Sequence, residues 1–281
     1  MSKKKINIAI IGATGFTGLE LTLLLSKHPN VKIKYLCATK NLGKKISFFD
    51  NRIKKTLPKI CSIKKIDWSL LDLVFLSLPN GQAQKLVSKV FYRYLNLKFI
   101  DLSADFRIFD IHEYKKNYNM KHKCPELLKD TIYSISEFVK KDINKFRIIA
   151  NPGCYPTSVQ LPIIPLLKKK LIKNNITIDS KSGFSGAGKN LEKKFKHKNL
   201  YNSTFAYGTK KHRHVVEIDQ EMNKHLGQKI NFTFNPHLLP TFRGILTSIY
   251  VDLKKGKKIE TLRNELINFY KKDRFIKILK L

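Results

Sequence analysis

The chain has 281 residues, and 42% of them are hydrophobic, which is enough for one large core or two modest ones. No apolar run approaches the length that crosses a bilayer, so the sequence indicates no membrane partner. The formal net charge of +34 would suit a nucleic-acid-binding protein, but only eight of the 55 basic residues are arginine and no nucleic-acid motif accompanies them, so we expect no nucleic-acid partner.

The first predicted element is a strand over residues 6–11, which is followed by a glycine turn and a leucine-rich helix. The apolar run is too short for a signal peptide. The turn from Gly12 to Gly18 has the spacing G-x-x-G-x-x-G, and this order of elements opens a dinucleotide-binding unit. Glycines let the backbone approach a pyrophosphate, and the helix N-terminus favours its charge. We expect cofactor contacts from Gly12, Thr14, Gly15, Phe16 and Thr17.

A second strand, predicted over residues 31–36, runs out at Cys37-Ala38-Thr39-Lys40 without an aspartate or glutamate. Enzymes that bind NAD usually carry an acidic residue there for the ribose hydroxyls. A hydroxyl and a lysine suit the additional phosphate of NADP instead. We therefore expect NADPH/NADP as the cofactor, with Thr39 and Lys40 in contact.

Further strands are predicted over residues 71–79, 98–103 and 146–150, with a helix over 82–94. Alternating strands and helices predict an α/β fold with a parallel, doubly wound sheet of the Rossmann type. Ligands bind beyond the carboxyl ends of the strands in such sheets. The segments expected at that edge are the glycine turn, the cofactor contact Pro79, the loop from Ser103 to Arg107, and Cys154.

Cys154 lies between Pro152-Gly153 and Tyr155-Pro156-Thr157, at a predicted turn-to-helix junction. The N-terminal end of a helix favours a thiolate, so this cysteine is a candidate nucleophile, although cysteines are more often simply buried. The other cysteines are not closely spaced, which favours a reducing, cytoplasmic setting over a disulfide framework; they are Cys37, Cys61 and Cys124.

The half of the chain after Cys154 shows a different pattern. Strands are predicted over residues 175–181, 230–234 and 245–251, and a donor-rich loop, Ser182 to Lys189, follows the first of them. This half is typical of an α+β domain with a mainly antiparallel sheet. We therefore predict two domains, residues 1–153 for the cofactor and residues 154–281 for catalysis and oligomerisation.

Six segments in one order resemble a known enzyme family: Gly12 to Gly18, Leu102 to Arg107, Ala150 to Thr157, Ser182 to Gly188, His212-Arg213-His214 with Glu217, and Pro236 to Gly244. Together they are similar to the N-acetyl-gamma-glutamyl-phosphate reductases, NADPH-dependent enzymes of arginine biosynthesis, over essentially the whole chain. The resemblance implies a Rossmann domain followed by an α+β catalytic domain, in agreement with the pattern above. It also implies a homo-oligomer, a dimer or a tetramer.

The resemblance further implies a mechanism. The Cys154 thiolate attacks an acyl phosphate, phosphate leaves, and hydride reduces the thioester to a semialdehyde. A histidine exchanges protons with the thiol, and both His212 and His214 are candidates because alternation puts them on one face of an extended segment. Substrate contacts are expected from Arg107, Ser185 and Arg213. No third ligand cluster accompanies the histidines, so no metal is expected.

The sequence departs from the family's pattern in two places. Thr39-Lys40 stands where the family often has Ser-Arg, which keeps the charge but loses the two-pronged hydrogen bonding of arginine. The family's chain normally continues past the position of Leu281 with a glycine-rich helix that returns to the cofactor domain, and we expect that segment to be missing. The alternatives are a related semialdehyde dehydrogenase of the aspartate or aminoadipate type, and a remnant of the reductase without turnover.

Overall fold

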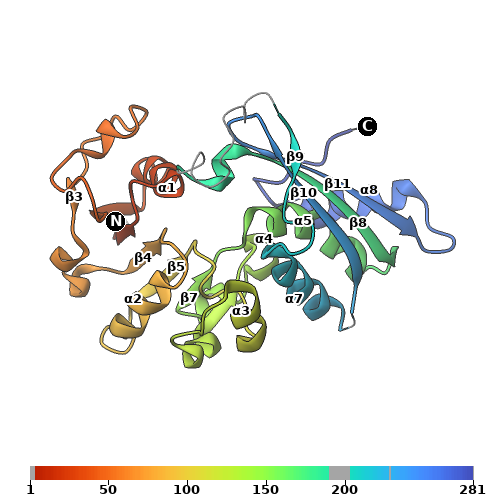
Figure 1. Cartoon of the computed structure of the whole chain (residues 1–281), viewed down its shortest axis with the longest axis horizontal. Coiled ribbons are helices and arrows are strands. Elements are labelled where there is room, and N and C mark those ends of the chain that lie inside the picture. Colours follow the sequence, from red (N-terminus) through yellow and green to blue (C-terminus); the bar gives the residue numbers. More distant parts are fainter. Residues whose placement is uncertain (1–3, 190–202, 228, 281) are drawn as a thin grey trace. The chain divides into compact units, whose positions relative to one another are not determined.

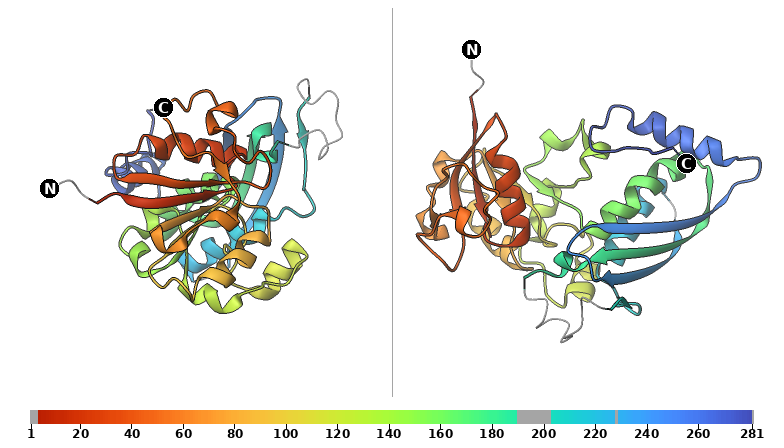
Figure 2. Two further views of the ribbon diagram at one scale, coloured as in Figure 1. Left: turned by 90° about the vertical axis from the view of Figure 1, so that its left-hand side faces the viewer. Right: turned by 90° about the horizontal axis from the view of Figure 1, so that it is seen from above.

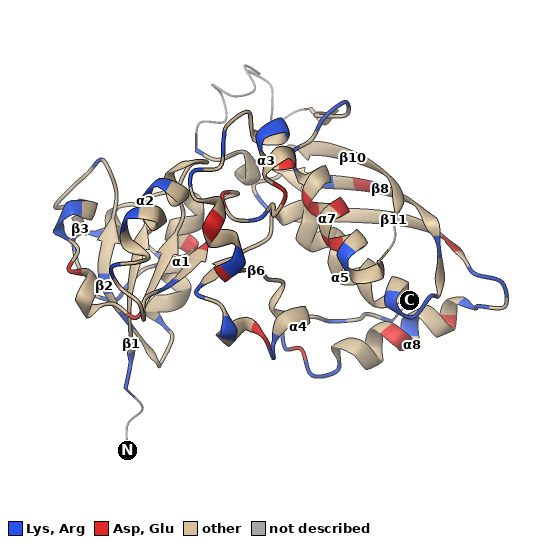
Figure 3. Cartoon of the chain, turned by 90° about the horizontal axis from the view of Figure 1, so that it is seen from below, with Lys and Arg blue, Asp and Glu red and all other residues tan. Residues whose placement is uncertain are grey.

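The computed structural model describes residues 4–189, 203–227 and 229–280. The chain divides into two compact units, Met1–Pro152 and Gly153–Leu281, and each is built on its own β-sheet (Figure 1). Lys and Arg occur on helices, strands and loops of both units (Figure 3). Within the described ranges, no helix is both long enough and apolar enough to span a membrane.

The first unit contains a sheet of seven parallel strands in the spatial order β3-β2-β1-β4-β5-β7-β6. Its strands are β1 (Ile6–Ile11), β2 (Val31–Cys37), β3 (Ile60–Cys61), β4 (Leu73–Leu76), β5 (Lys98–Asp101), β6 (Thr131–Tyr133) and β7 (Ile148–Ala150). The chain builds one wing from β1 to β3 and then returns to build the other, so the predicted doubly wound sheet is confirmed. The reversal lies between β1 and β4, where ligands bind in folds of this class.

Helices and short 3-10 turns connect these strands. They are α1 (Phe16–Ser26), η1 (Ile46–Phe48), η2 (Ile63–Lys65), η3 (Trp68–Leu70), α2 (Gln82–Val90), α3 (Ile111–Tyr118), η4 (Pro125–Asp130), α4 (Ser136–Val139) and η5 (Ile143–Lys145). One core cluster joins Leu19 of α1 to Ile8 and Ile10, and another joins Val87 of α2 to Phe99. Because both faces of the sheet are covered, its strands are apolar runs rather than alternating ones.

The helix predicted over residues 82–94 is shorter in the structure, because α2 ends at Val90. The carbonyls of Phe91, Tyr94 and Leu97 accept hydrogen bonds from the Arg147 guanidinium at 2.7–3.2 Å. The same guanidinium lies 3.8 Å from the centre of the Phe91 ring. A cation at this place satisfies carbonyls that the helix leaves open and opposes the negative end of its dipole.

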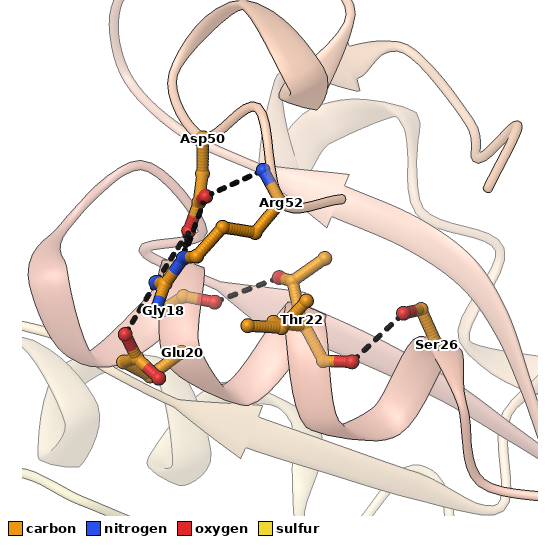
Figure 4. A network of polar contacts seen from close by, with 7 residues as sticks. Gly18, Glu20, Thr22, Ser26, Asp50 and Arg52 are labelled. Atoms are coloured by element: carbon orange, nitrogen blue, oxygen red, sulfur yellow. Dashed lines mark hydrogen bonds and ion pairs between the residues drawn. The ribbon is translucent and has the colours of Figure 1, made fainter. Parts of the chain in front are cut away.

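Helix α1 is attached to the segment after β2 through Arg52 (Figure 4). The guanidinium donates to the carboxylate of Asp50 at 2.7–3.2 Å and pairs with Glu20 on α1. On the buried side of the helix, Thr22 Oγ1 donates to the carbonyl of Gly18 at 2.7 Å. Arg52 is half exposed, so these ion pairs orient the segment more than they stabilise the fold.

The second unit contains a four-stranded sheet in the order β11-β8-β10-β9. Strands β8 (Ile172–Gly183) and β10 (Asn231–Leu239) pair in parallel. Strand β11 (Ile245–Leu253) pairs antiparallel with β8, and β9 (Phe205–Ala206) pairs antiparallel with β10. The predicted mainly antiparallel sheet is therefore confirmed, with a parallel pair at its centre.

One face of this sheet carries the helices of the second unit, α5 (Cys154–Lys168), α7 (His214–Leu226) and α8 (Ile259–Tyr270), while η6 (Phe184–Ala187) follows β8. Figure 2 shows these helices beside the sheet. Ile176 and Ile178 of β8 pack with apolar residues of the helices in a single cluster. The alternate residues point to the other face, where Tyr250 pairs opposite Thr177 and Leu246 opposite Lys181. Tyr250 and Leu246 are 63% and 62% exposed, so this face of the sheet is open.

Helix α5 contains Pro162 and Pro165, which remove two backbone donors from its interior. Pro165 has no N–H for the carbonyl of Leu161, four residues earlier. That carbonyl accepts instead from the hydroxyl of Tyr270, the last residue of α8, at 2.5 Å. Tyr270 is 4% exposed, so the bond replaces the missing helical one in the interior and joins α8 to α5.

Removing this hydroxyl tests its role. Tyr270→Phe leaves a buried carbonyl without its donor and should lower the free energy of unfolding by about 1–3 kcal/mol. Tyr250→Phe on the open sheet face is the matched control and should change it by less than about 0.5 kcal/mol. Chemical denaturation measures both, and equal effects would mean that the Tyr270 hydroxyl does not satisfy Leu161.

Candidate active site

The glycine turn after β1 is held by the end of the neighbouring strand β2. Gly12 has a φ of +87°, and its N–H and that of Ala13 both donate to the carbonyl of Cys37, at 2.9 and 3.0 Å. The N–H of Gly15 donates to the carbonyl of Gly12 at 3.2 Å, and α1 begins at the next residue. The turn therefore has a fixed shape that depends on where β2 ends.

The three glycines of the turn, Gly12, Gly15 and Gly18, differ in whether the fold itself has room for a side chain at their position. A β-carbon on Gly12 would lie 2.0 Å from the Ser77 carbonyl oxygen, and one on Gly18 would lie 2.2 Å from the Gly12 carbonyl oxygen. Both glycines are therefore required by the packing of the first unit itself. A β-carbon on Gly15 would meet nothing closer than the Gly12 carbonyl oxygen at 3.5 Å, an ordinary contact, and its φ of −73° suits any residue. The fold thus does not require Gly15, whereas close approach of a ligand would.

The start of α1 fits an anion. Its N-cap is Gly15, which has no side chain to cap the helix, and the first turn carries no acidic residue. Backbone donors and the positive end of the helix dipole suit a phosphate at such a place. The predicted contacts Thr14, Phe16 and Thr17 belong to this turn, and together with Gly12 and Gly15 they fit the pyrophosphate of a dinucleotide.

The other predicted cofactor contacts lie at the same edge of the sheet. Strands β2, β1 and β4 are adjacent and parallel, so their carboxyl ends meet there. Thr39 and Lys40 follow β2 and are exposed. Pro79 follows β4, and its carbonyl accepts the Gln82 N–H at the start of α2 at 3.1 Å. The fold brings these residues to one edge, and their contacts with a cofactor stay predictions.

Three ionisable side chains lie in the interior of the first unit at the end of β5 and in the loop that follows: Asp101, Asp105 and Arg107. Oδ1 of the fully buried Asp101 accepts from the amide and hydroxyl of Ser103 at 2.9 and 2.6 Å, while Oδ2 has no hydrogen-bond partner among the residues described. Burial raises the pKa of this carboxyl to about 6. Arg107 is 7% exposed and donates to the carbonyls of Asn151 and Leu102 at 2.7 and 3.0 Å. It thereby ties this loop to the segment before Cys154, and its predicted substrate contact stays a prediction.

Asp105, in the same loop, was not singled out from the sequence. Its carboxylate accepts from the N–H groups of Gly81 and Gln84 at 2.6 and 3.0 Å. It therefore caps the start of α2 from 24 and 21 residues away in the chain. A cap from such a distance has no signature in the local sequence, and only the packing of the loop reveals it.

In the second unit, Cys154 is the first residue of α5 and is exposed. The first turn of this 15-residue helix has no acidic residue, so its positive end stabilises a thiolate. The preceding Gly153 is fixed from both sides. Its carbonyl accepts from the amide and hydroxyl of Thr157 at 3.0 and 2.9 Å, and its N–H donates to Oε1 of the fully buried Glu217 at 2.6 Å.

His214 packs directly on the residue before Cys154. A β-carbon on Gly153 would lie 2.7 Å from His214 Nε2, closer than a real side chain can stand, so only glycine admits the imidazole. His214 is 7% exposed, and its N–H donates to Nδ1 of His212 at 3.2 Å. The structure therefore brings together both predicted histidines and gives them different places. His214 faces Gly153, whereas His212 supports the start of α7.

Two tyrosines that the sequence did not indicate as site residues complete this cluster. The ring of Tyr155 contacts the rings of His212 and His214, with centroids 5.5 and 5.9 Å apart. The Tyr207 hydroxyl donates to the Tyr155 hydroxyl, which donates to the carbonyl of His237, each at 3.1 Å. Burial raises the pKa of both tyrosines, and the neighbouring Cys154 anion raises them further. Both hydroxyls therefore stay protonated beside the thiolate.

Ser185 lies in a loop that main-chain bonds hold in place. The N–H groups of Gly183, Phe184 and Ser185 donate to the carbonyls of Gly244, Thr241 and Phe242 at 2.8–2.9 Å. Arg213 is exposed immediately ahead of α7. The substrate contacts of Ser185 and Arg213 stay predictions. Across the described ranges, no group of three or more His, Cys, Asp or Glu side chains is arranged to hold a metal ion.

Comparison with known proteins extends this assignment of fold. Residues 7–146 match the family described as semialdehyde dehydrogenase, NAD binding domain, and residues 154–281 match semialdehyde dehydrogenase, dimerisation domain. Aspartate semialdehyde dehydrogenase II from Vibrio cholerae has a TM-score of 0.69 and 18% identity, over 94% of this chain and 79% of that one. The Candida albicans enzyme, solved with NADP, has a TM-score of 0.64 and 17% identity, over 93% and 76%. At such identities these two structures show the fold alone.

Curated relatives are much more similar in sequence. The N-acetyl-gamma-glutamyl-phosphate reductase of Ehrlichia ruminantium (strain Gardel) is 43% identical, over 97% of this chain and 79% of its own length. The probable chloroplastic enzyme of Arabidopsis thaliana is 40% identical, over 99% of this chain and 69% of its own length. These relatives confirm the resemblance first drawn from the six sequence segments. The chain belongs to the N-acetyl-gamma-glutamyl-phosphate reductase family.

Proposed function

We propose that the chain uses NADPH to reduce N-acetyl-L-glutamyl 5-phosphate to N-acetyl-L-glutamate 5-semialdehyde and phosphate, through a thioester on Cys154, as a step of arginine biosynthesis. The observation that carries this proposal is the exposed Cys154 at the start of α5, with His214 seated on the adjacent Gly153. The first unit serves the cofactor, and the second serves catalysis and oligomerisation.

The reaction follows from what a thiolate at this place can do. Cys154 Sγ forms a bond to the acyl carbon, and phosphate leaves with the electrons of the broken C–O bond. NADPH, when bound, supplies the hydride that reduces the resulting thioester. The hemithioacetal on Cys154 then breaks its C–S bond, which releases the aldehyde and returns the thiolate. Sulfur suits both steps because it is a good nucleophile at neutral pH and a good leaving group.

His214 is the proposed proton carrier for Cys154. Its Nε2 lies against Gly153, one residue from the thiol, and its position at the start of α7 keeps the ring in place. His212 Nδ1 already accepts the backbone N–H of His214, so His212 positions the other histidine. Glu217, three residues after His214 on the same side of α7, fixes the Gly153 amide and so the start of α5.

The cofactor proposal rests on the first unit, which matches an NAD binding domain. Gly15 and the open start of α1 take the pyrophosphate, with Thr14, Phe16 and Thr17 around it. Thr39 and Lys40 take the 2′-phosphate, because no acidic residue at the end of β2 would repel it. Arg107, Ser185 and Arg213 take the carboxylate and phosphate of the substrate.

We further propose that the chain works in the cytoplasm as a homo-oligomer, a dimer or a tetramer. Its second unit matches a dimerisation domain. The open sheet face offers a place for a second copy, because Leu246 and Tyr250 leave large apolar side chains in solvent there. Sedimentation of the purified chain measures the assembly directly, and a monomer at all concentrations would contradict it.

Replacing the nucleophile tests the reaction. In the reverse direction, with N-acetylglutamate semialdehyde, phosphate and NADP, Cys154→Ser should lower kcat by about 10³-fold or more, because a hydroxyl at this place is a poor nucleophile. NADPH affinity should be unchanged, and Cys61→Ser, a thiol outside the site, should keep full activity. Equal rates for Cys154→Ser and the parent chain would refute the role of Cys154. A parent chain that binds NADPH without turnover would favour a remnant of the reductase.

The two histidines can be separated by matched substitutions. His214→Gln should lower kcat/KM by about 10²–10⁴-fold, the usual contribution of a general base, and should flatten the acid limb of the pH–rate profile. It should also slow alkylation of Cys154 by iodoacetamide. His212→Gln should lower the rate less and keep the acid limb. The opposite order of effects would move the proton carrier to His212.

The glycines provide a test of the cofactor site. Gly15→Ala should leave the thermal unfolding midpoint nearly unchanged, because its β-carbon meets only an ordinary contact. The same change should weaken NADPH binding, because the added methyl group keeps the pyrophosphate away from the backbone N–H groups at the start of α1. The loss of one hydrogen bond to a charged group corresponds to a decrease in affinity of about tenfold or more. Gly12→Ala should instead destabilise the first unit, since its β-carbon overlaps the Ser77 carbonyl and its φ is positive. Normal NADPH affinity in Gly15→Ala would contradict the placement of the pyrophosphate.

A further inference from the structure

Cys37 and Cys61 form a pair of thiols that has no role in the proposed reaction. Their Sγ atoms lie 3.6 Å apart, although 24 residues separate them in the chain. They are direct neighbours across the parallel strands β2 and β3. Neighbouring strands are about 4.8 Å apart, which falls within the range of Cα separations that a disulfide spans. The backbone thus already holds the two sulfurs close to bonding geometry.

The two thiols differ in accessibility. Cys37 is 1% exposed, and burial, followed by the charge of Cys61, raises the pKa of its thiol. Cys61 is half-buried and lies on β3, the outermost strand at this end of the sheet. An oxidant therefore reaches Cys61 first, while Cys37 stands beside it as a protonated thiol.

Both cysteines make main-chain hydrogen bonds at or near the glycine turn that follows β1. The carbonyl of Cys37 accepts the N–H groups of both Gly12 and Ala13. The carbonyl of Cys61 accepts the N–H of Ala38 at 3.2 Å, just before Thr39 and Lys40. The same two residues that carry the thiols therefore hold the main chain at the cofactor edge of the sheet.

We propose that Cys37 and Cys61 are a modification site, a dithiol that peroxides convert to a reversible disulfide, and that this bond weakens cofactor binding. The effect on the cofactor rests on the proposed function, whereas the formation of the bond does not.

The oxidation of the two thiols to a disulfide balances with hydrogen peroxide as the only co-reactant. The Cys61 thiol gives up its proton and its sulfur attacks one oxygen of hydrogen peroxide, which breaks the O–O bond and gives a sulfenic acid and hydroxide. The hydroxide takes the proton that Cys61 gave up and becomes the first water. The Cys37 sulfur then attacks the Cys61 sulfur, the S–O bond breaks, and the leaving hydroxide takes the Cys37 proton as a second water. Two thiols lose two electrons and two protons, and one peroxide is reduced to two waters. A small thiol returns both cysteines by exchange.

Closure would act on the turn through the ends of β2 and β3. The bond draws the sulfurs from 3.6 Å to about 2.0 Å. Strand β3 has only two residues and one neighbouring strand, so it shifts more easily than the interior strands. Ile60 exchanges hydrogen bonds with Gly43 and Lys44 at 2.8 and 2.9 Å, which carries the shift to the segment after Lys40. At the other end, the shift reaches the carbonyl that holds Gly12 and Ala13.

Mass spectrometry tests the bond. The Cys154→Ser chain is treated with hydrogen peroxide and digested without reduction, which should give one Cys37–Cys61 cross-linked peptide that dithiothreitol separates. Cys61→Ser in the same background is the matched control and should give no cross-link. Because Cys61 is half-buried, this control remains usable even where Cys37→Ser fails to fold. The peroxide concentration is one that oxidises Cys154 in the parent chain. If Cys37 and Cys61 stay reduced at that concentration, the proposal is overturned.

An NADPH titration after removal of the peroxide tests the coupling. The disulfide should weaken binding by about fivefold or more, the loss of roughly one hydrogen bond in the turn, and dithiothreitol should restore it. Peroxide-treated Cys61→Ser should bind as tightly as the untreated chain. A cross-link with unchanged affinity would overturn the link to the cofactor. A reduced chain that binds no NADPH would overturn the proposed function instead, and the mass measurement would still decide on the disulfide.

Discussion

The absence of a side chain at Gly153 is the constraint on which the candidate site in the second unit depends. The imidazole of His214 occupies the space where a β-carbon would stand, and the amide of Gly153 gives the buried Glu217 carboxylate a donor. A buried carboxylate without such a donor would be strongly unfavourable. His214 and Glu217 lie on one turn of α7, so a single contact between α7 and the start of α5 brings together Cys154, the proposed nucleophile, and His214, its proposed proton carrier.

Glycines have two distinct roles in the first unit. Gly12 and Gly18 are required because the main chain itself fills the space around them. A β-carbon on Gly15 would make only an ordinary contact, and the backbone there is unstrained, so the fold itself does not require a glycine at this position. A sequence motif of three glycines therefore mixes two positions that the turn requires with one that it does not. Only the structure tells which is which.

Features that depend on local sequence could be predicted, and those that depend on distant partners could not. The glycine turn, the apolar strands and the start of α5 at Cys154 each follow from neighbouring residues. The end of α2 depends on Arg147, which is 56 residues beyond Phe91. The hydrogen bond that replaces the one missing in α5 comes from Tyr270, which is 109 residues beyond Leu161. Strand β3 is too short for any periodicity to show, so the pairing of Cys37 with Cys61 was also hidden. Buried and exposed residues alternate along a strand in the same way whether its neighbour is parallel or antiparallel. The pattern in β8 and β10 therefore could not show that these two strands run in the same direction.

The parallel pairing of β8 with β10 has a topological consequence for the histidines. Two parallel strands cannot be joined by a hairpin, because the chain must first return to the end from which it started. Helix α7 lies on this return path, and its first residue is His214. The histidines thus belong to the connection that the parallel pairing requires, between β9, which pairs antiparallel with β10, and the body of α7. If the connection between β8 and β10 were shortened to a tight turn, β10 would have to run in the opposite direction. The position at which His214 meets α5 would then be lost.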